Sequence, residues 1–139
     1  MLRGSMPLSK AEPAPERPTV LLVEDQVLIR LMVADELRQL GIQVLEASSA
    51  EEAWLVLQSP LPVHLLFTDV HLPGRMDGIA LAGRVRMHYP QLKVIITSSE
   101  LPQGAAPVLA DAFVAKPYIM PILVKQIMTL LEQANAIEG

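Results

Sequence analysis

Short apolar runs alternate with longer segments of helical period along the chain from Thr19 onward. The run TVLLVE (Thr19 to Glu24) is apolar on both faces, which is typical of a central parallel strand. Four further runs are predicted as strands: IQVLEA (Ile42 to Ala47), HLLFTD (His64 to Asp69), KVIITS (Lys93 to Ser98) and AFVAK (Ala112 to Lys116).

The segments between these runs have the period of helices. The first helix is predicted over Gln26 to Leu40, and Gly41 suits its C′ position. Its apolar stripe consists of Ile29, Val33, Leu37 and Leu40. Ser49 can cap a second helix that reaches about Gln58, with acidic residues favourably placed in its first turn.

A third helix is predicted over Gly78 to His88, with Arg84 and Arg86 on a solvated face. A last helix has Pro121 in its first turn and reaches about Ala134. It carries two apolar stripes, and one is enough for a core. The first is Ile119, Leu123, Ile127 and Leu130, and the second is Met120, Val124, Met128 and Leu131. We interpret the second stripe as a candidate surface for a homodimer or a protein target.

Two segments lack a clear period. Residues 1–18 mix proline, charge and small residues, so we expect a disordered tail, in which Gly4-Ser5-Met6 resembles a cloning scar. Between Glu100 and Asp111, two prolines and a glycine predict that any helix is short or broken at its start.

Five βα repeats of this size predict an α/β fold. We expect a doubly wound, five-stranded parallel sheet of the flavodoxin-like (βα)5 type, with strand order 2-1-3-4-5 and helices on both faces. The 139 residues, 51% of them apolar, suit a single domain over residues 19–136. In such sheets ligands bind beyond the carboxyl ends of the strands.

The predicted strand ends carry polar residues. Strand one is followed by Glu24 and Asp25, strand three ends in Asp69, strand four has Thr97 and strand five ends in Lys116. Taken singly, each has an ordinary explanation: Asp25 as a helix N-cap, Asp69 as a turn residue, Thr97 as a β-former and Lys116 as a solvated charge. Their coincidence at the same ends of four strands favours a shared site.

Three carboxylates at one edge repel each other. At about 5 Å each pair costs roughly 3 kcal/mol at an effective dielectric constant near 20, and a divalent cation relieves that cost. With oxygen ligands and no cysteine in the chain, Mg²⁺ is the natural occupant. It would make a carboxylate a plausible phosphoryl acceptor, with Lys116 and the Thr97 hydroxyl able to bind the phosphoryl oxygens.

Composition excludes several classes of function. A net charge of −4 does not fit a basic nucleic-acid footprint or a polybasic membrane anchor. The absence of cysteine excludes thiol catalysis, thiolate zinc sites and disulfides. No apolar stretch approaches the roughly 18 residues that cross a bilayer. We therefore expect a cytoplasmic protein without direct nucleic-acid or membrane contact.

The motifs VLLVEDQ, LLFTDVHLPG, DG, VIITSS and FVAKPY, in this order, resemble the receiver domain of two-component response regulators. The resemblance covers Thr19 to Ala134. It implies that Asp69 is the phosphoacceptor. It also implies Mg²⁺ ligation by Asp25, Asp69 and the main-chain carbonyl of His71, with a Glu24 contact through water.

The same resemblance implies that Thr97 and Lys116 bind the phosphoryl group and that Phe113 is the switch aromatic. In that family a histidine kinase or a histidine phosphotransfer protein supplies the phosphoryl group.

The chain departs from the family pattern in four places, one of which is Ser98, where a small apolar residue is more usual after the threonine. The loop between Asp69 and Gly78 is one residue longer than is common, in PGRMDG. The segment between the fourth and fifth strands is short and contains prolines, which predicts a stunted signalling helix. Asp111 stands where the family favours glycine, a position that suits a left-handed conformation.

The leading hypothesis is a phosphorylation-controlled switch that works through protein partners and is not a classical enzyme. The chain ends soon after the last helix, which suits a stand-alone receiver or one cut from a longer protein. A receiver-like interaction module that accepts no phosphate is one alternative. A Mg²⁺ phosphatase of the haloacid dehalogenase type would need an acid where His71 stands, and a flavin carrier would need a glycine-rich phosphate loop after strand one.

Overall fold

The computed structural model describes residues 17–100 and 109–138. Its strands are β1 (Thr19–Val23), β2 (Gln43–Ala47), β3 (Leu65–Asp69), β4 (Lys93–Ser98) and β5 (Ala112–Ala115), and its helices are α1 (Val27–Gln39), α2 (Ala50–Gln58), α3 (Gly78–His88) and α5 (Met120–Glu138). The tail predicted over residues 1–18 and the broken helix predicted between Glu100 and Asp111 lie largely outside the described residues.

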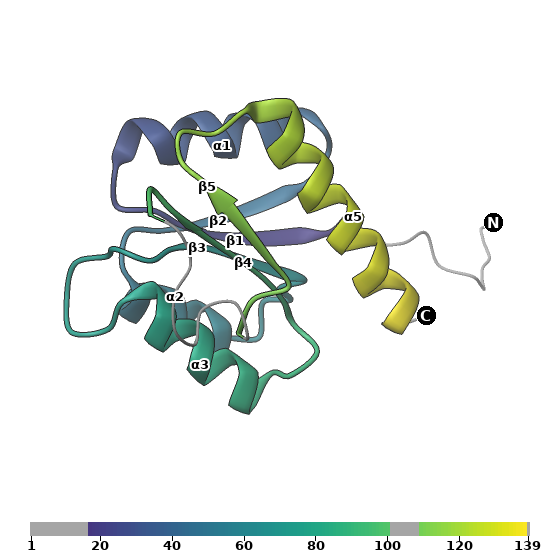
Figure 1. Cartoon of the computed structure of the whole chain (residues 1–139). Helices are drawn as coiled ribbons and strands as arrows, with labels where there is room; N and C mark the ends of the chain where they lie inside the picture. Colours follow the sequence, from purple (N-terminus) through teal and green to yellow (C-terminus); the bar gives the residue numbers. More distant parts are fainter. Residues whose placement is uncertain (1–16, 101–108, 139) are drawn as a thin grey trace.

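The five strands form one parallel sheet in the order β2-β1-β3-β4-β5, which confirms the predicted topology. Helices α1 and α5 cover one face of the sheet, and α2 and α3 cover the other (Figure 1). Every residue of β1 and β3 is buried, because these central strands have neighbours on both sides and helices on both faces.

The core consists of two apolar clusters, one on each face of the sheet. Along β3, Leu65 and Phe67 belong to the cluster under α1 and α5, whereas Leu66 belongs to the cluster under α2 and α3. Side chains alternate along a strand, so Asp69 follows Phe67 on the α1/α5 side. The packing of the apolar residues of β3 thus decides on which face of the sheet the Asp69 carboxylate lies.

Helix α1 ends as predicted, but its apolar stripe differs at one position. Gly41 has φ 84°, its N–H donates to the Arg38 carbonyl at 3.0 Å, and the Ile42 N–H donates to the Leu37 carbonyl at 3.2 Å. Leu40, predicted to lie on the buried stripe, is 49% exposed. The chain turns towards β2 at this point, so Ile42 is buried in the core where Leu40 was expected.

The other helix starts follow local signals. The Ser49 side chain caps α2 by accepting from the Glu52 N–H at 3.1 Å, as predicted. The Asp77 side chain caps α3 through the Ala80 N–H at 2.8 Å, which the sequence analysis did not identify. Among the described helices, none is both long and apolar enough to cross a membrane.

Helix α5 begins at Met120 with Pro121 in its first turn and extends beyond the predicted end. Its buried residues are Leu123, Ile127, Leu130, Leu131 and Ala134, and Met120 also packs against the core. Ile119, expected in the core, is 63% exposed. The division into one core stripe and one free stripe is therefore wrong, because the helix lies on the sheet along a line between the two.

Candidate functional site

The carboxyl ends of β1 and β3 bring three carboxylates together. Strand β1 pairs in parallel with β3, which places Glu24 and Asp69 at the same edge of the sheet. Glu24 is 1% exposed and Asp69 is 5% exposed, whereas Asp25 is open to solvent. One oxygen from each of these three residues lies within 4.8 Å of the others. The cluster expected from the strand ends is present.

Lys116 reaches this cluster from the end of β5. Its Nζ donates to Glu24 Oε1 at 2.9 Å and to Asp69 Oδ2 at 2.7 Å. Burial alone would lower the pKa of Lys116, but the hydrogen bonds with Asp69 and Glu24 outweigh that effect and raise it. Lys116 is therefore a charged partner of two buried carboxylates, and its interpretation as a solvated charge is wrong.

Main-chain groups orient the same carboxylates. The Gln26 N–H donates to Glu24 Oε2 at 3.1 Å, and the His71 N–H donates to Asp69 Oδ1 at 3.3 Å. Gln26, and not Asp25, occupies the N-cap position of α1, so the N-cap explanation of Asp25 is wrong. The Asp25 side chain is left at the open side of the cluster, where it can contact a ligand.

Thr97 lies beside the phosphoacceptor candidate. Thr97 and Asp69 are partners in the β3–β4 register, and the Val70 N–H donates to the Thr97 carbonyl at 3.0 Å. The Thr97 side chain is fully buried, yet its hydroxyl meets no hydrogen-bond partner among the described residues. Buried hydroxyls are normally paired, so this one is suited to a ligand that enters the site.

A cavity of about 570 Å³ opens over the carboxylates. Its lining includes Asp25, Asp69, His71, Lys116 and Tyr118. The donors offered to a metal here are carboxylate and carbonyl oxygens, which are the ligands that Mg²⁺ prefers. The residues present therefore fit a magnesium ion with a phosphoryl group beside it.

The loop between β3 and α3 is anchored by helix α2. Glu51 Oε2 accepts from the N–H groups of Arg75 at 2.9 Å and Met76 at 3.0 Å. The backbone N–H of Glu51 itself, followed by those of Met76 and Arg75, lowers the pKa of the Glu51 carboxyl. In the sequence Glu51 is recognisable only as an acid in the first turn of a helix, because nothing local indicates a contact with a loop 24 residues away along the chain.

Helix α3 starts against the backbone of Asp69. The Gly78 N–H donates to the Val70 carbonyl at 2.9 Å. A Cβ on Gly78 would overlap the carbonyl oxygen of Asp69, so no larger residue fits without moving one of the two segments. Gly78 thus sets the position of the loop that carries His71.

Asp111 has a structural role. Its Oδ2 accepts from the Val94 N–H at 2.8 Å and from Arg86 Nη2 at 2.6 Å. Arg86 also donates to the carbonyls of Leu109 at 2.8 Å and Leu92 at 2.9 Å. Arg86 therefore does not lie on a solvated face, as the sequence had suggested, but joins the start of β4 to the start of β5.

Phe113 lies on the opposite face of the sheet from Phe67. It packs, half-buried, against the cluster under α2 and α3, and its register partner is Ile96. Its neighbour Val114, the partner of Thr97, belongs to the cluster under α1 and α5.

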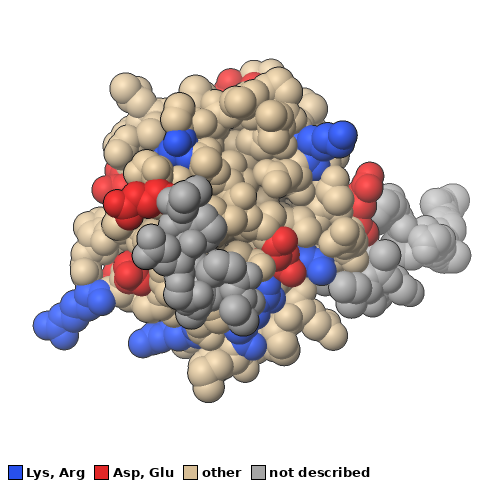
Figure 2. Space-filling view, in the orientation of Figure 1, with Lys and Arg blue, Asp and Glu red and all other residues tan. Residues whose placement is uncertain are grey.

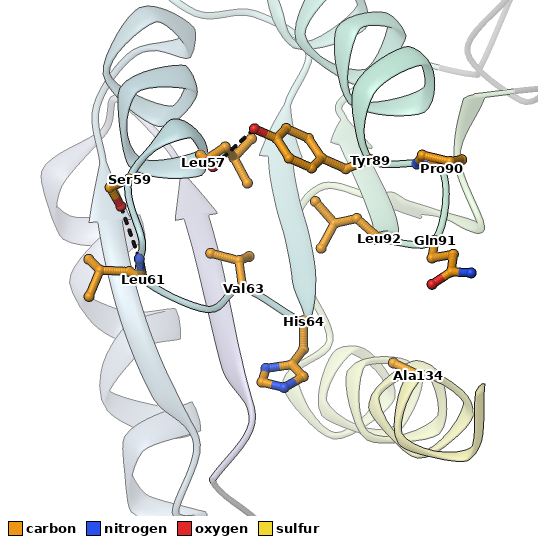
Figure 3. A pocket seen from close by; sticks show the side chains of 10 residues that line it. All are labelled: Leu57, Ser59, Leu61, Val63, His64, Tyr89, Pro90, Gln91, Leu92 and Ala134. Atoms are coloured by element: carbon orange, nitrogen blue, oxygen red, sulfur yellow. Dashed lines mark hydrogen bonds between the residues drawn. The ribbon is translucent and has the colours of Figure 1, made fainter. Parts of the chain in front are cut away.

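A second cavity, of about 450 Å³, lies at the amino-terminal ends of the strands, opposite the carboxylates (Figure 3). Leu57, Val63, Tyr89 and Leu92 form part of its lining. His64 also lines it, but its Nδ1 already accepts from the Thr19 N–H at 3.0 Å. The described lining offers no carboxylate, so this cavity does not fit the metal chemistry predicted for the chain.

Surface charge on one side of the molecule is mixed. In the view of Figure 2, acidic and basic side chains are both scattered over the surface, with several basic ones along the lower side, and most of the face carries neither.

The family model for the response regulator receiver domain matches residues 20–128. This chain belongs to that family. The receiver domain is 34% identical over 110 residues to a probable chemotaxis protein CheY from Rhizobium etli, an alignment that covers 74% of this chain and 84% of that protein. It is 33% identical over 122 residues to the sensor kinase CckA of Brucella abortus, where the alignment covers 84% of this chain but only 13% of the kinase.

Solved structures share the fold. The response regulator protein TrrA from Thermotoga maritima, in complex with Mg²⁺ and BeF, superimposes with a TM-score of 0.73 at 24% identity, over 81% of this chain and 98% of that one. At this identity the likeness shows the fold alone. Receiver domains are signalling domains and not classical enzymes, so the haloacid dehalogenase and flavin alternatives are excluded.

Proposed function

We propose that this receiver domain accepts a phosphoryl group on Asp69 and acts as a Mg²⁺-dependent signalling switch. One observation supports it above the others: three carboxylates converge within 4.8 Å, and the Lys116 ammonium lies 2.7 Å from Asp69. Ionised carboxylates this close repel one another, so the cluster favours a bound cation that offsets the repulsion.

Asp25, Asp69 and the main-chain carbonyl of His71 would hold the magnesium ion, and Glu24 would contact it through water. When bound, the ion neutralises the negative charge that otherwise repels an incoming phosphoryl group. Asp25 is suited to direct ligation because its side chain is exposed and lines the cavity over the carboxylates.

In the transfer step, one carboxylate oxygen of Asp69 attacks the phosphorus of a phosphohistidine. The phosphorus–nitrogen bond breaks, and its electron pair returns to the imidazole of the donor, which leaves an acyl phosphate on Asp69. Lys116 can then pair with a phosphoryl oxygen, and the Thr97 hydroxyl can donate to another.

We infer that the donor is a sensor histidine kinase or a histidine phosphotransfer protein and that the output goes to a protein target in the cytoplasm. The similarity to part of a sensor kinase supports a kinase or phosphotransfer partner. Phe113 is the proposed switch aromatic, since it precedes Val114, the register partner of Thr97, and a movement of Thr97 can reach it through the backbone of β5.

Binding of beryllofluoride with Mg²⁺ tests the proposal, because this complex mimics an aspartyl phosphate. We expect the amide NMR signals between Thr97 and Phe113 to shift in the wild type. Asp69→Asn should abolish the response. Asp35→Asn, which removes an exposed carboxylate from α1, is the matched control and should respond like the wild type.

A wild type and an Asp69→Asn variant that respond alike would contradict the assignment of the phosphoacceptor. A wild type with no response to the analogue would instead favour a receiver-like interaction module.

A further inference from the structure

Two buried hydroxyls in the described part of the chain lack a hydrogen-bond partner, and they belong to Thr97 and Tyr118. Tyr118 follows β5 and lines the cavity over the carboxylates. Its ring packs edge-on against Phe67 with centroids 5.9 Å apart, and Lys116 Nζ lies 6.0 Å from its centroid. The hydroxyl is therefore held inside the proposed phosphorylation site.

Tyr118 is on the same face of the sheet as Thr97. Phe67 and Tyr118 belong to the cluster under α1 and α5, and Asp69, two residues after Phe67, points to that side with its register partner Thr97. Phe113 packs on the other face. Of these two aromatic residues, Tyr118 therefore lies on the Thr97 side of the sheet.

The Tyr118 hydroxyl keeps its proton under ordinary conditions. Burial raises the pKa of Tyr118 to about 12, and the neighbouring Thr97 hydroxyl lowers it in part. The two groups are therefore adjacent, although their geometry is not that of a hydrogen bond.

We propose that Tyr118 is a positioning residue for Thr97: its hydroxyl donates to Thr97 Oγ1 while Thr97 donates its only proton to a phosphoryl oxygen on Asp69. A threonine hydroxyl has one proton and two acceptor lone pairs. Once that proton is used in the hydrogen bond to the phosphoryl oxygen, the buried Thr97 Oγ1 can only accept, and its lone pair needs a hydrogen-bond donor. Tyr118 supplies it, so both orphaned hydroxyls are satisfied together.

This inference rests on the proposed phosphorylation of Asp69 and predicts a linked effect. Tyr118→Phe keeps the ring that packs on Phe67 and removes only the hydroxyl. We expect it to weaken beryllofluoride binding at saturating Mg²⁺ by about fivefold, the factor that corresponds to one neutral hydrogen bond. Without the analogue the variant should be at least as stable as the wild type, because it lacks an unpaired buried hydroxyl.

A double-mutant cycle separates positioning from simple packing. The dissociation constant of beryllofluoride is measured by NMR titration for the wild type, Tyr118→Phe, Thr97→Val and the double variant. Thr97→Val should weaken binding, and adding Tyr118→Phe to it should change nothing further. The ¹³Cζ signal of Tyr118 should shift on binding in the wild type and stay in place in Thr97→Val.

Tyr89→Phe is the matched control. The Tyr89 hydroxyl donates to the Leu57 carbonyl at 3.2 Å in the second cavity, at the amino-terminal ends of the strands (Figure 3), so its loss should leave analogue binding unchanged.

Wild-type affinity in Tyr118→Phe would overturn the inference and leave the proposed function intact. If Tyr118→Phe weakened analogue binding equally in the wild type and in Thr97→Val, the inference would also be overturned, because Tyr118 would then act independently of Thr97. Failure of the wild type to bind the analogue would overturn the proposed function and this inference together.

Discussion

At the scale of single residues, the site depends on how Lys116 offsets two buried carboxylates. Its Nζ lies within 3 Å of oxygens from Glu24 and Asp69, at 2.9 and 2.7 Å. Both acids are almost fully buried, so their ionised forms need a positive partner. Either the lysine or a magnesium ion can neutralise these carboxylates, so we expect the effects of the lysine and of the metal on stability to be linked.

Lys116→Met tests this balance. Loss of the ammonium leaves the two carboxylates without their partner, so we expect a loss of about 3 kcal/mol in the free energy of unfolding in the absence of Mg²⁺. Mg²⁺ should restore part of the loss because it replaces the missing charge. Urea denaturation followed by Trp54 fluorescence, with and without Mg²⁺, measures both values.

Lys125→Met serves as the control for that experiment, since Lys125 is exposed on α5 and its loss should cost less than about 0.5 kcal/mol. A deficit in Lys116→Met that is the same with and without the ion would show that the lysine and the metal do not share the carboxylates.

At the scale of elements, helix α3 holds the loop beside the phosphoacceptor in two ways. Its first residue, Gly78, lies against the Asp69 backbone, and Asp77 caps it. The preceding loop is fastened to α2 through Glu51. The loop is thus held between two helices, and the His71 N–H at its start donates to Asp69 Oδ1 at 3.3 Å.

Two glycines of α3 predict opposite effects of the same substitution. Gly78→Ala should destabilise the protein by about 1–3 kcal/mol, because its Cβ would overlap the Asp69 carbonyl. Gly83→Ala should stabilise it by about 0.5–1 kcal/mol, because no atom beyond the adjoining helix backbone lies within 4 Å of the new Cβ and alanine favours a helix. Chemical denaturation of both variants measures the difference.

Gly78→Ala should in addition shift the amide signals of the 69–71 segment in NMR spectra, and Gly83→Ala should leave them in place. Equal stability of the two variants would show that the helix start does not press on the phosphoacceptor backbone.

At the scale of the whole molecule, Arg86 joins parts of the sheet that are distant in the sequence. It links α3 to Leu92 before β4 and to Leu109 and Asp111 before β5. Asp111 completes the link through the Val94 N–H. Asp111 therefore provides a carboxylate partner for the half-buried Arg86 guanidinium group.

Arg86→Met should reduce the free energy of unfolding by about 2 kcal/mol, because several carbonyls and one carboxylate lose a charged donor. Arg84→Met in the same helix removes only a guanidinium 5.4 Å above the Trp54 ring and should cost about 0.5 kcal/mol. Thermal or urea unfolding compares the two, and equal costs would contradict the role of Arg86 as a link.

Much of the fold was predictable because its signals are local. Apolar periods located every described strand and helix to within a few residues, and the cap residues Ser49 and Gly41 behaved as expected. Leu40 and the second stripe of α5 were misassigned, since which side of a helix is covered depends on where the helix lies on the sheet. The period of apolar residues along the chain does not indicate where a helix lies on the sheet.

The sequence by itself determined the class of the fold, a doubly wound parallel sheet, and the identity of the residues at the carboxyl ends of its strands. The crossover connections between parallel strands are right-handed, which leaves few topologies, and the carboxyl ends of all the strands lie on one side of the sheet. Only the tertiary structure decided that Lys116 pairs with two carboxylates, that Glu51 holds the loop before α3, and that Tyr118 lies beside Thr97. These contacts join residues far apart in the chain, and whether polar atoms meet there depends on ångström-scale packing of side chains, which no local pattern encodes.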